Sequence, residues 1–283
     1  MNNRVLISAD CVCDIPVEMA EELNVSLMYY YIITEEGRFR DMTEIRTEQV
    51  LEYMEVDRKK AHSAAAKTED YREYFAGLRK KTEKPIIHLC MSKKLSRGCG
   101  RAEEAAKSFK DIYVVDSKNI SGGMGHLVFQ AAEMANAGAC VEMILAMLEG
   151  NRRKVQTTVL LDSTECVFRS GNLEKTQHLF CETLNLHPMV RLRAGRLTFF
   201  GLCFGNPYRY AKKYLRRILK RPEEINTEFA LLMYTSCPEE LIREIEAEMR
   251  RLVDFRRILV VPTYATVSCD IGSGCFGVVY IKK

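Results

Sequence analysis

The first half of the chain alternates between short apolar runs and segments with helical spacing. Apolar runs typical of buried strands occupy Arg4–Ala9, Ser26–Thr34, Ile86–Met91 and Asp111–Asp116. Helices are predicted after Pro16, over Glu69–Lys81, over Ala102–Phe109 and over about Gly125–Glu149. Strands that alternate with helices at this spacing predict a parallel sheet covered by helices on both faces.

The pattern changes after about Gly150, where hairpins become mixed with helices. Strands are predicted at Val155–Leu161, Glu228–Tyr234, Ile258–Val261 and Val278–Ile281, the last two around the loop SCDIGSGC. Helices are predicted at Asp162–Phe168, Tyr208–Leu219 and Pro238–Val253, with a turn at Arg169–Asn172. His187–Leu192 and Arg196–Phe200 form a predicted hairpin with Gly195 in its turn. We therefore expect two domains, an α/β domain at 1–154 and an α+β domain at 155–283.

Composition narrows the class of protein. The chain has 283 residues, 47% hydrophobic and 28% charged, values typical of globular proteins. A net charge of +4 is too small to indicate a nucleic-acid partner, and no apolar run approaches the roughly 18 residues of a membrane span. The N-terminal segment does not read as a signal peptide. The eleven cysteines are odd in number and scattered, so we expect reduced thiols in a cytoplasmic protein and no metal site.

Three loops carry hydroxyl groups or glycines next to a predicted strand or helix: His62–Ala66, Leu95–Gly98 and Cys269–Gly274. A hydroxyl such as that of Ser63 or Ser96 can donate to an anion while nearby backbone amides and the helix dipole add attraction. The alternative is that both serines cap helices, which is the commonest role of Ser at such a position. The pattern alone favours the capping role.

The motifs of the common enzyme classes are missing. There is no G-x-S-x-G elbow, no H-E-x-x-H and no Walker loop, and Ser121–Gly125 lacks the full order of a phosphate-binding loop. The five histidines show no metal-ligand spacing. Seven Lys and Arg residues lie between Arg209 and Arg221, which indicates either a solvated helix face or a surface for an anionic partner.

The ordered set of loops is more specific than any one of them. The opening VLISADCVCDIP is similar to a D-S-T-x-D-L-P start, with Asp10 and Asp14 retained. Further segments match in order: Phe39–Asp41 (Y-x-D), Ser63–Lys67 (T-S-Q-P-S), Leu95-Ser96 (I-S-S-x-L-S-G-T), Val114–Ser117 with Ser121–Gly125 (V-I-D-S-x-x-x-S-x-G-x-G), Phe168–Leu173 (L-K-K-G-G-R-I), Leu184–Arg191 (L-N-I-K-P-I-L) and Gly272–Gly277 (H-T-G-P-G-A-L-G). Along essentially its whole length the chain resembles the DegV family of bacterial fatty-acid-binding proteins.

The resemblance implies a two-domain α/β protein that holds one long-chain fatty acid, such as palmitate, in a tunnel between the domains. It places the fatty-acid carboxylate at the hydroxyls of Ser63 and Ser96. It also implies a binding subunit without catalysis or cofactor, which presents the carboxylate to a separate fatty acid kinase. Contact with a membrane surface is left open, and no nucleic acid is expected.

Two departures from the family pattern bear on the head-group site. Arg97 stands where the family has Gly, and Asp270 stands where the family has His. A carboxylate facing a fatty-acid carboxylate is repulsive unless one is protonated or a cation lies between them. We therefore expect either that Arg97 and Asp270 pair, or that Arg97 takes the ligand while Asp270 points away. The alternative function is a stand-alone hydrolase or transferase using Ser96, with Lys93 and Lys94 the only nearby bases.

Overall fold

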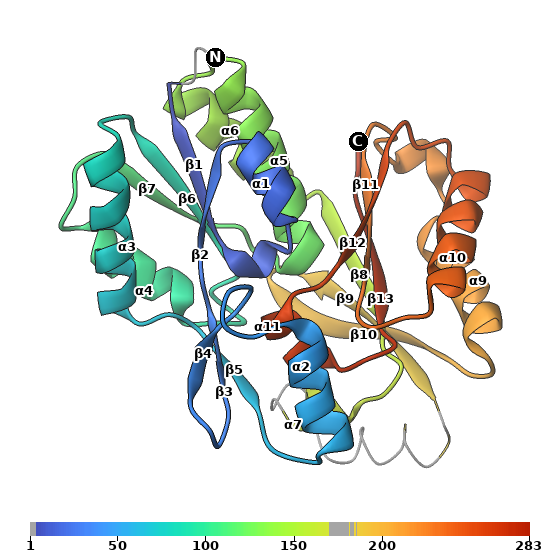
Figure 1. The fold of residues 1–283 in the computed structure, drawn as a ribbon. Helices are drawn as coiled ribbons and strands as arrows, with labels where there is room; N and C mark the ends of the chain where they lie inside the picture. Colours follow the sequence, from blue (N-terminus) through green and yellow to red (C-terminus); the bar gives the residue numbers. More distant parts are fainter. Residues whose placement is uncertain (1–3, 170–180, 182–183, 185) are drawn as a thin grey trace. The chain divides into compact units, whose positions relative to one another are not determined.

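The structure is a computed structural model that describes residues 4–169, 181, 184 and 186–283 (Figure 1). The chain folds into two compact units. The first contains residues 1–31, 64–154 and 194–196, and the second contains 32–63, 155–193 and 197–283. This division shares the expected boundary at 154/155 and differs from the expected domains in residues 32–63 and 194–196. The domains themselves stay a prediction.

The first unit is built on a four-stranded parallel sheet, which confirms the predicted α/β class. Its strand order is β2 (Val25–Met28), β1 (Leu6–Asp10), β6 (Ile86–Cys90) and β7 (Ile112–Asp116). On one side lie α3 (Thr68–Lys81) and α4 (Gly98–Ala106), and on the other α5 (Ser121–Asn136) and α6 (Val141–Asn151) (Figure 1). A short 3-10 helix (Cys11–Cys13) and α1 (Val17–Glu22) follow β1. All five residues of β6 are buried, as expected for a strand covered on both faces.

The second unit contains a six-stranded mixed sheet. Its order is β10 (Arg196–Cys203), β9 (His187–Arg193), β8 (Val155–Leu160), β13 (Phe276–Ile281), β11 (Ala230–Tyr234) and β12 (Ile258–Pro262). Strands β11 and β12 are parallel, whereas the pairs β11–β13, β13–β8 and β8–β9 are antiparallel. The helices α9 (Pro207–Ile218) and α10 (Glu239–Leu252) bury their apolar faces in the same core as β8, β11 and β13. This is the α+β architecture that the sequence predicts.

Smaller elements complete the second unit. A three-stranded sheet has the order β4 (Arg38–Arg40), β3 (Tyr31–Ile33) and β5 (His62–Ala64). The helices are α2 (Thr47–Leu51) with a π-helical turn (Glu52–Val56), α7 (Glu165–Arg169), α11 (Ala265–Ile271) and a 3-10 turn (Pro222–Glu224). Residues of α2, α7 and α11 share one apolar cluster with Ile32 of β3. The sequence analysis did not predict β4, β5 or α2.

The predicted hairpin is confirmed. Strands β9 and β10 are neighbours, and they are joined through Ala194 at φ 51° and Gly195 at φ 81°. Two consecutive residues with positive φ define the turn type whose twist matches that of the flanking strands. Glycine adopts this conformation at little cost, which explains the residue at the second position.

Two predicted elements are wrong because the chain breaks inside them. The single strand expected over Ser26–Thr34 is two strands in different sheets, and the break lies at Tyr30, whose amide donates to Cys11 Sγ at 3.2 Å. The long helix expected over Gly125–Glu149 is α5 and α6. Gly138 at φ 87° ends α5, and the Ala139 amide donates to the Met134 carbonyl, as in a Schellman cap.

Other boundaries also differ from the prediction. Helix α5 begins at Ser121 rather than about Gly125, and α7 begins at Glu165 rather than Asp162. Helix α4 begins at Gly98 rather than Ala102, and the expected loop around Asp270 is in its first part the helix α11. Arg169 ends α7, and the rest of the predicted turn at Arg169–Asn172 lies outside the described residues. Within the described residues, no helix combines the length and the apolarity needed to cross a membrane.

Candidate functional site

The Asp10 carboxylate lies at the carboxyl end of β1 and is fully buried. It accepts hydrogen bonds from the Tyr71 hydroxyl at 2.6 Å and from the Tyr30 hydroxyl and the Met91 amide at 3.1 Å each. These donors come from α3, from the segment after β2 and from the end of β6. A buried carboxylate must be satisfied by several donors, so Asp10 joins these three segments.

His88 on β6 extends the same network. Its Nε2 lies 3.3 Å from Asp10 Oδ1 and its Nδ1 lies 2.8 Å from Ser8 Oγ, which lies 2.7 Å from the Tyr74 hydroxyl. If the Nε2 carries the hydrogen, Tyr74 donates to Ser8, Ser8 donates to Nδ1, and His88 donates to Asp10. Every polar atom of this chain of contacts then has a partner, which favours a structural role for His88.

One group of side chains in the described part of the chain has ligand atoms close enough to hold a metal ion, within 4.8 Å of one another. It consists of Asp10, His88 and Cys90. All three are buried. The carboxylate oxygens of Asp10 already accept from two tyrosines and an amide, which a cation would have to displace. This arrangement therefore fits a hydrogen-bonded anchor better than a metal site.

The loop that carries Ser96 is held next to this anchor. Ser96 Oγ accepts the Gly98 amide at 3.0 Å, in the turn just before α4. The N-cap residue of α4 is Arg97, without a side-chain cap, and Ser63 lies on β5, so the predicted role of both serines as helix caps is wrong. The Ser96 side chain also hydrogen-bonds with the side chain of Tyr30.

Gly98 fits this loop because a side chain there would collide with Tyr30. A Cβ added to Gly98 would lie 2.1 Å from the Tyr30 hydroxyl oxygen, whereas one added to Gly100, two residues further along α4, would meet nothing within 4 Å. The absence of a side chain at Gly98 therefore allows the hydrogen bond between Tyr30 and Asp10.

We expect Gly98→Ala to lower the free energy of unfolding by about 1–3 kcal/mol, because overpacking would push Tyr30 away from Asp10. Gly100→Ala is the matched control, and it should raise that free energy by about 0.5–1 kcal/mol through its effect on helix entropy. Urea unfolding followed by circular dichroism measures both. Equal stability of the two variants would contradict the proposed role of Gly98.

The second unit places Ser63 and Asp270 together. The Ser63 hydroxyl, on β5, donates to Asp270 Oδ1 at 2.9 Å, and Asp270 lies in the last turn of α11. Burial raises the pKa of Asp270 to about 6, and the hydrogen bond from Ser63 opposes this shift. The two residues that the sequence assigned to different loops thus share one hydrogen bond.

Asp41 fixes the other end of α11. Its carboxylate accepts the Ala265 amide at 3.0 Å and the Thr266 amide at 2.8 Å, the first two amides of that helix. Amides at a helix N-terminus have no partner within the helix, so a carboxylate from elsewhere in the chain stabilises it. Burial raises the pKa of Asp41, while the hydrogen bonds lower it. Asp41 therefore acts on Asp270 by positioning its helix.

Glu55 holds the glycine-rich segment that follows α11. It accepts the Ser273 amide at 2.9 Å and the Ser273 hydroxyl at 2.8 Å. The flanking Gly272 and Gly274 have φ values of 80° and 71°, a conformation that favours glycine. The sequence analysis singled out the glycines and missed Glu55, because nothing distinguishes it from the other acidic residues of its segment.

Arg97 is exposed at the N-cap position of α4 in the first unit. Ser96 belongs to the same unit, whereas Ser63 and Asp270 belong to the second. The pairing of Arg97 with Asp270, and the convergence of Ser63 and Ser96 on one carboxylate, therefore stay predictions.

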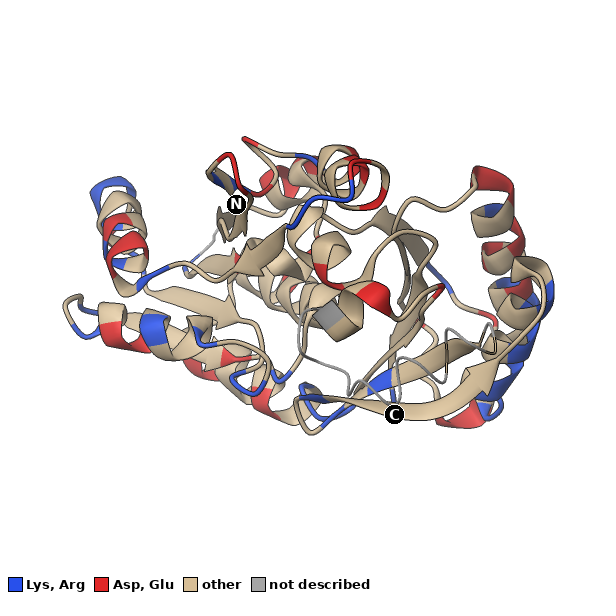
Figure 2. Ribbon diagram, turned by 90° about the horizontal axis from the view of Figure 1, so that it is seen from below, with Lys and Arg blue, Asp and Glu red and all other residues tan. Residues whose placement is uncertain are grey.

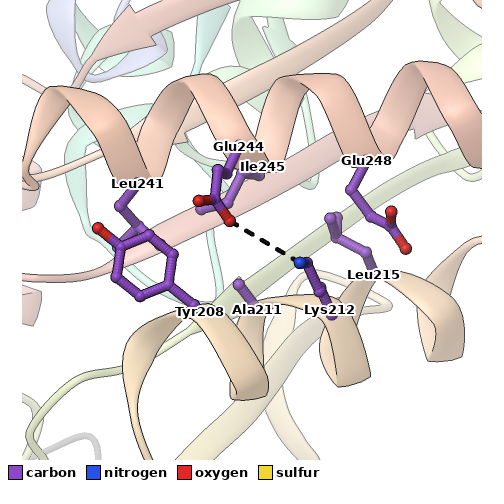
Figure 3. A pocket seen from close by; sticks show the side chains of 8 residues that line it. All are labelled: Tyr208, Ala211, Lys212, Leu215, Leu241, Glu244, Ile245 and Glu248. Carbon is purple, nitrogen blue, oxygen red and sulfur yellow. Dashed lines mark ion pairs between the residues drawn. The ribbon is translucent and has the colours of Figure 1, made fainter.

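The basic residues of α9 are largely engaged within the second unit. Figure 2 shows Lys and Arg concentrated along this helix. Lys212 pairs with Glu244 at 3.9 Å (Figure 3). Arg216 pairs with Glu248 at 3.6 Å, and Arg217 donates to the Phe200 carbonyl. These contacts to α10 and β10 favour the interpretation as a solvated face.

A small pocket lies between α9 and α10, lined by Tyr208, Ala211, Lys212, Leu215, Leu241, Glu244, Ile245 and Glu248 (Figure 3). Its cavity volume is about 10 Å³, which is no more than a single water molecule requires. It cannot hold an acyl chain.

With this geometry in place, comparison with known proteins defines the class. The model of the family described as "Uncharacterised protein, DegV family" matches residues 4–283, so the chain belongs to the DegV family. A DegV domain-containing protein of Caldanaerobacter subterraneus subsp. tengcongensis is 24% identical over 99% of each chain.

Solved structures agree in fold. A fatty-acid-binding DegV family protein from Thermus thermophilus has a TM-score of 0.87, 24% identity, and coverage of 99% of this chain and 100% of its own. The Fatty Acid Kinase (Fak) B3 protein of Streptococcus pneumoniae, loaded with linoleic acid, has a TM-score of 0.83, 17% identity and 99% coverage of both chains. These likenesses confirm the expected two-domain α/β fold.

Proposed function

We propose that this protein binds one long-chain fatty acid and presents its carboxylate to a separate fatty acid kinase, without catalysing a reaction itself. Membership of the DegV family supports the proposal, together with the fatty acids named for the Thermus thermophilus and Streptococcus pneumoniae proteins. The observation that carries it is the Ser63 hydroxyl beside Asp270, on the segment that the sequence assigns to the head group.

In this proposal the ligand carboxylate accepts hydrogen bonds from Ser63 and Ser96. Both side chains are half-buried rather than fully buried. The contacts with the Gly98 amide and with the Tyr30 side chain orient Ser96. Hydrogen bonds to a charged acceptor are the stronger kind, so two hydroxyls are a sufficient anchor for a carboxylate. The acyl chain would lie in an apolar tunnel between the two domains.

The proposal includes a role in the cytoplasm, where a kinase finds its nucleotide. It assigns no cofactor to the protein, and the fatty acid is its ligand. In this proposal Ser96 binds the head group rather than attacking a substrate.

Native mass spectrometry of the purified protein tests this function. We expect a co-purified ligand with the mass of a C14–C20 fatty acid, released intact on denaturation. Adding palmitate to delipidated protein should restore the mass shift with a stoichiometry of one. A protein that carries no such ligand, and takes up none of the added palmitate, would contradict the proposal.

A further inference from the structure

The Asp270 carboxyl has an unusual position for an acidic side chain. It lies in the last turn of α11, which ends at Gly272 with φ 80°. The C-terminal end of a helix carries partial negative charge from its unpaired carbonyls, so it disfavours an ionised carboxylate. Among the described residues, Ser63 is the one that donates a hydrogen bond to this carboxyl.

The surroundings of Asp270 offer little compensation for a negative charge. The titratable side chains near Asp270 are Glu48 of α2, Glu52, Tyr53 and Glu55 of the π-helical turn, Glu165 and Cys166 of α7, His62 of β5 and Cys269 of α11 itself. Glu52 is exposed, Tyr53 is half-buried and Cys269 is a buried thiol. Glu48, Glu165 and His62 are exposed, Cys166 is a buried thiol, and Glu55 holds Ser273. The side chain of Arg169 lies outside the described residues. Burial and the Ser63 hydrogen bond are the two causes that shift the pKa of Asp270.

Ser63 has a single hydroxyl hydrogen, and Asp270 competes for it. While Asp270 is ionised, the Ser63 hydroxyl donates to Oδ1 and is lost to a ligand. When Asp270 takes up a proton, its own hydroxyl becomes a donor, and the Ser63 hydrogen can turn to another acceptor. The protonation state of Asp270 thus decides whether this site presents donors or a negative charge to an incoming anion.

On this basis, and resting on the proposed function, we propose that the protein takes up one proton with each fatty-acid anion that it binds. The proton is shared between the Asp270 carboxyl and the ligand carboxylate. Two ionised carboxylates at one site repel each other. The pair therefore binds one proton more tightly than either carboxylate does alone. The balance is one fatty-acid anion and one solvent proton bound per protein, with no covalent change.

The direction of the pH dependence follows from this balance. The complex carries one proton more than the free protein above the pKa of free Asp270, so affinity rises as pH falls. Palmitate itself, as an ordinary carboxylic acid, is ionised throughout the neutral range. Between pH 6.5 and the pKa of the complex, the dissociation constant should increase about tenfold per pH unit.

Binding of radiolabelled palmitate, below its solubility limit, tests this from pH 6.5 to 8.0. We expect the wild-type dissociation constant to increase about tenfold per pH unit, and that of Asp270→Asn, which retains a donor, to stay constant. Asp270→His should bind at least as well as the wild type at pH 8.0, since it removes the negative charge. Asp254→Asn, at an exposed position, is the control and should behave as the wild type.

Calorimetry in buffers of different ionisation enthalpy gives a second measure. We expect uptake of about one proton per palmitate at pH 7.5 for the wild type and none for Asp270→Asn. If palmitate binds with no proton uptake and no pH dependence, the proton-sharing proposal is overturned while the proposed function stands. If no variant binds palmitate at any pH, the proposed function itself fails.

Discussion

The double substitution Ser63→Ala with Ser96→Ala is expected to weaken palmitate binding about 100-fold or more, because each lost hydrogen bond to a charged group costs about 1.5–3 kcal/mol. Each hydroxyl already has a side-chain partner in the protein, Tyr30 for Ser96 and Asp270 for Ser63, which the ligand carboxylate replaces in this proposal. Retention of radiolabelled palmitate at pH 6.5 measures the effect.

The exposed Ser108 supplies the control, and Ser108→Ala should leave palmitate retention unchanged. Circular dichroism of the double variant establishes that both substitutions are tolerated by the fold. Unchanged retention by a folded double variant would remove both serines from the head-group site. Retention by Ser96→Ala alone would not, since Ser63 could still anchor the carboxylate.

A second large effect is expected at the buried anchor of the first unit. Asp10→Ala should lower the free energy of unfolding by about 3–5 kcal/mol, because it leaves the hydroxyls of Tyr30 and Tyr71 and the Met91 amide without their acceptor. Urea unfolding followed by tyrosine fluorescence measures this change.

Asp254→Ala is the matched control, since its exposed side chain should change the free energy of unfolding by at most about 0.5 kcal/mol. Asp10→Asn keeps the shape but brings an amide donor against existing donors, so we expect an intermediate loss. An Asp10→Ala variant as stable as the control would show that these hydrogen bonds add nothing to stability.

The sequence by itself determined the alternation of strands and helices and the hairpin, because these depend on local spacing and local conformation. The spacing of Tyr71, Phe75 and Leu78 predicts α3, and all three are buried. Gly195 at the turn predicts the β9–β10 hairpin, since glycine readily adopts a positive φ. The ordered motifs likewise identified the DegV family, which the family match confirms.

Local pattern failed where a distant contact decides the outcome. The apolar run Ser26–Thr34 reads as one strand, yet it breaks at Tyr30, which is held by Cys11 and Asp10. The start of α4 depends on the absence of a side chain at Gly98, because Tyr30 occupies that space. The residues in each of these contacts are far apart in the sequence. A short stretch of sequence around Tyr30 or Gly98 therefore does not reveal the contact that decides the local structure.

The candidate site divides in the same way. Motif order singled out Ser63, Ser96, Arg97 and Asp270, since loops that bear hydroxyls and charges are visible in sequence. Only the tertiary structure shows that the Ser63 hydroxyl lies 2.9 Å from Asp270. It also shows that Asp41 binds the N-terminal amides of α11, the helix that carries Asp270. The pKa of Asp270, about 6, likewise follows from burial. Burial is a property of the folded chain, because it depends on which distant segments exclude water from a side chain.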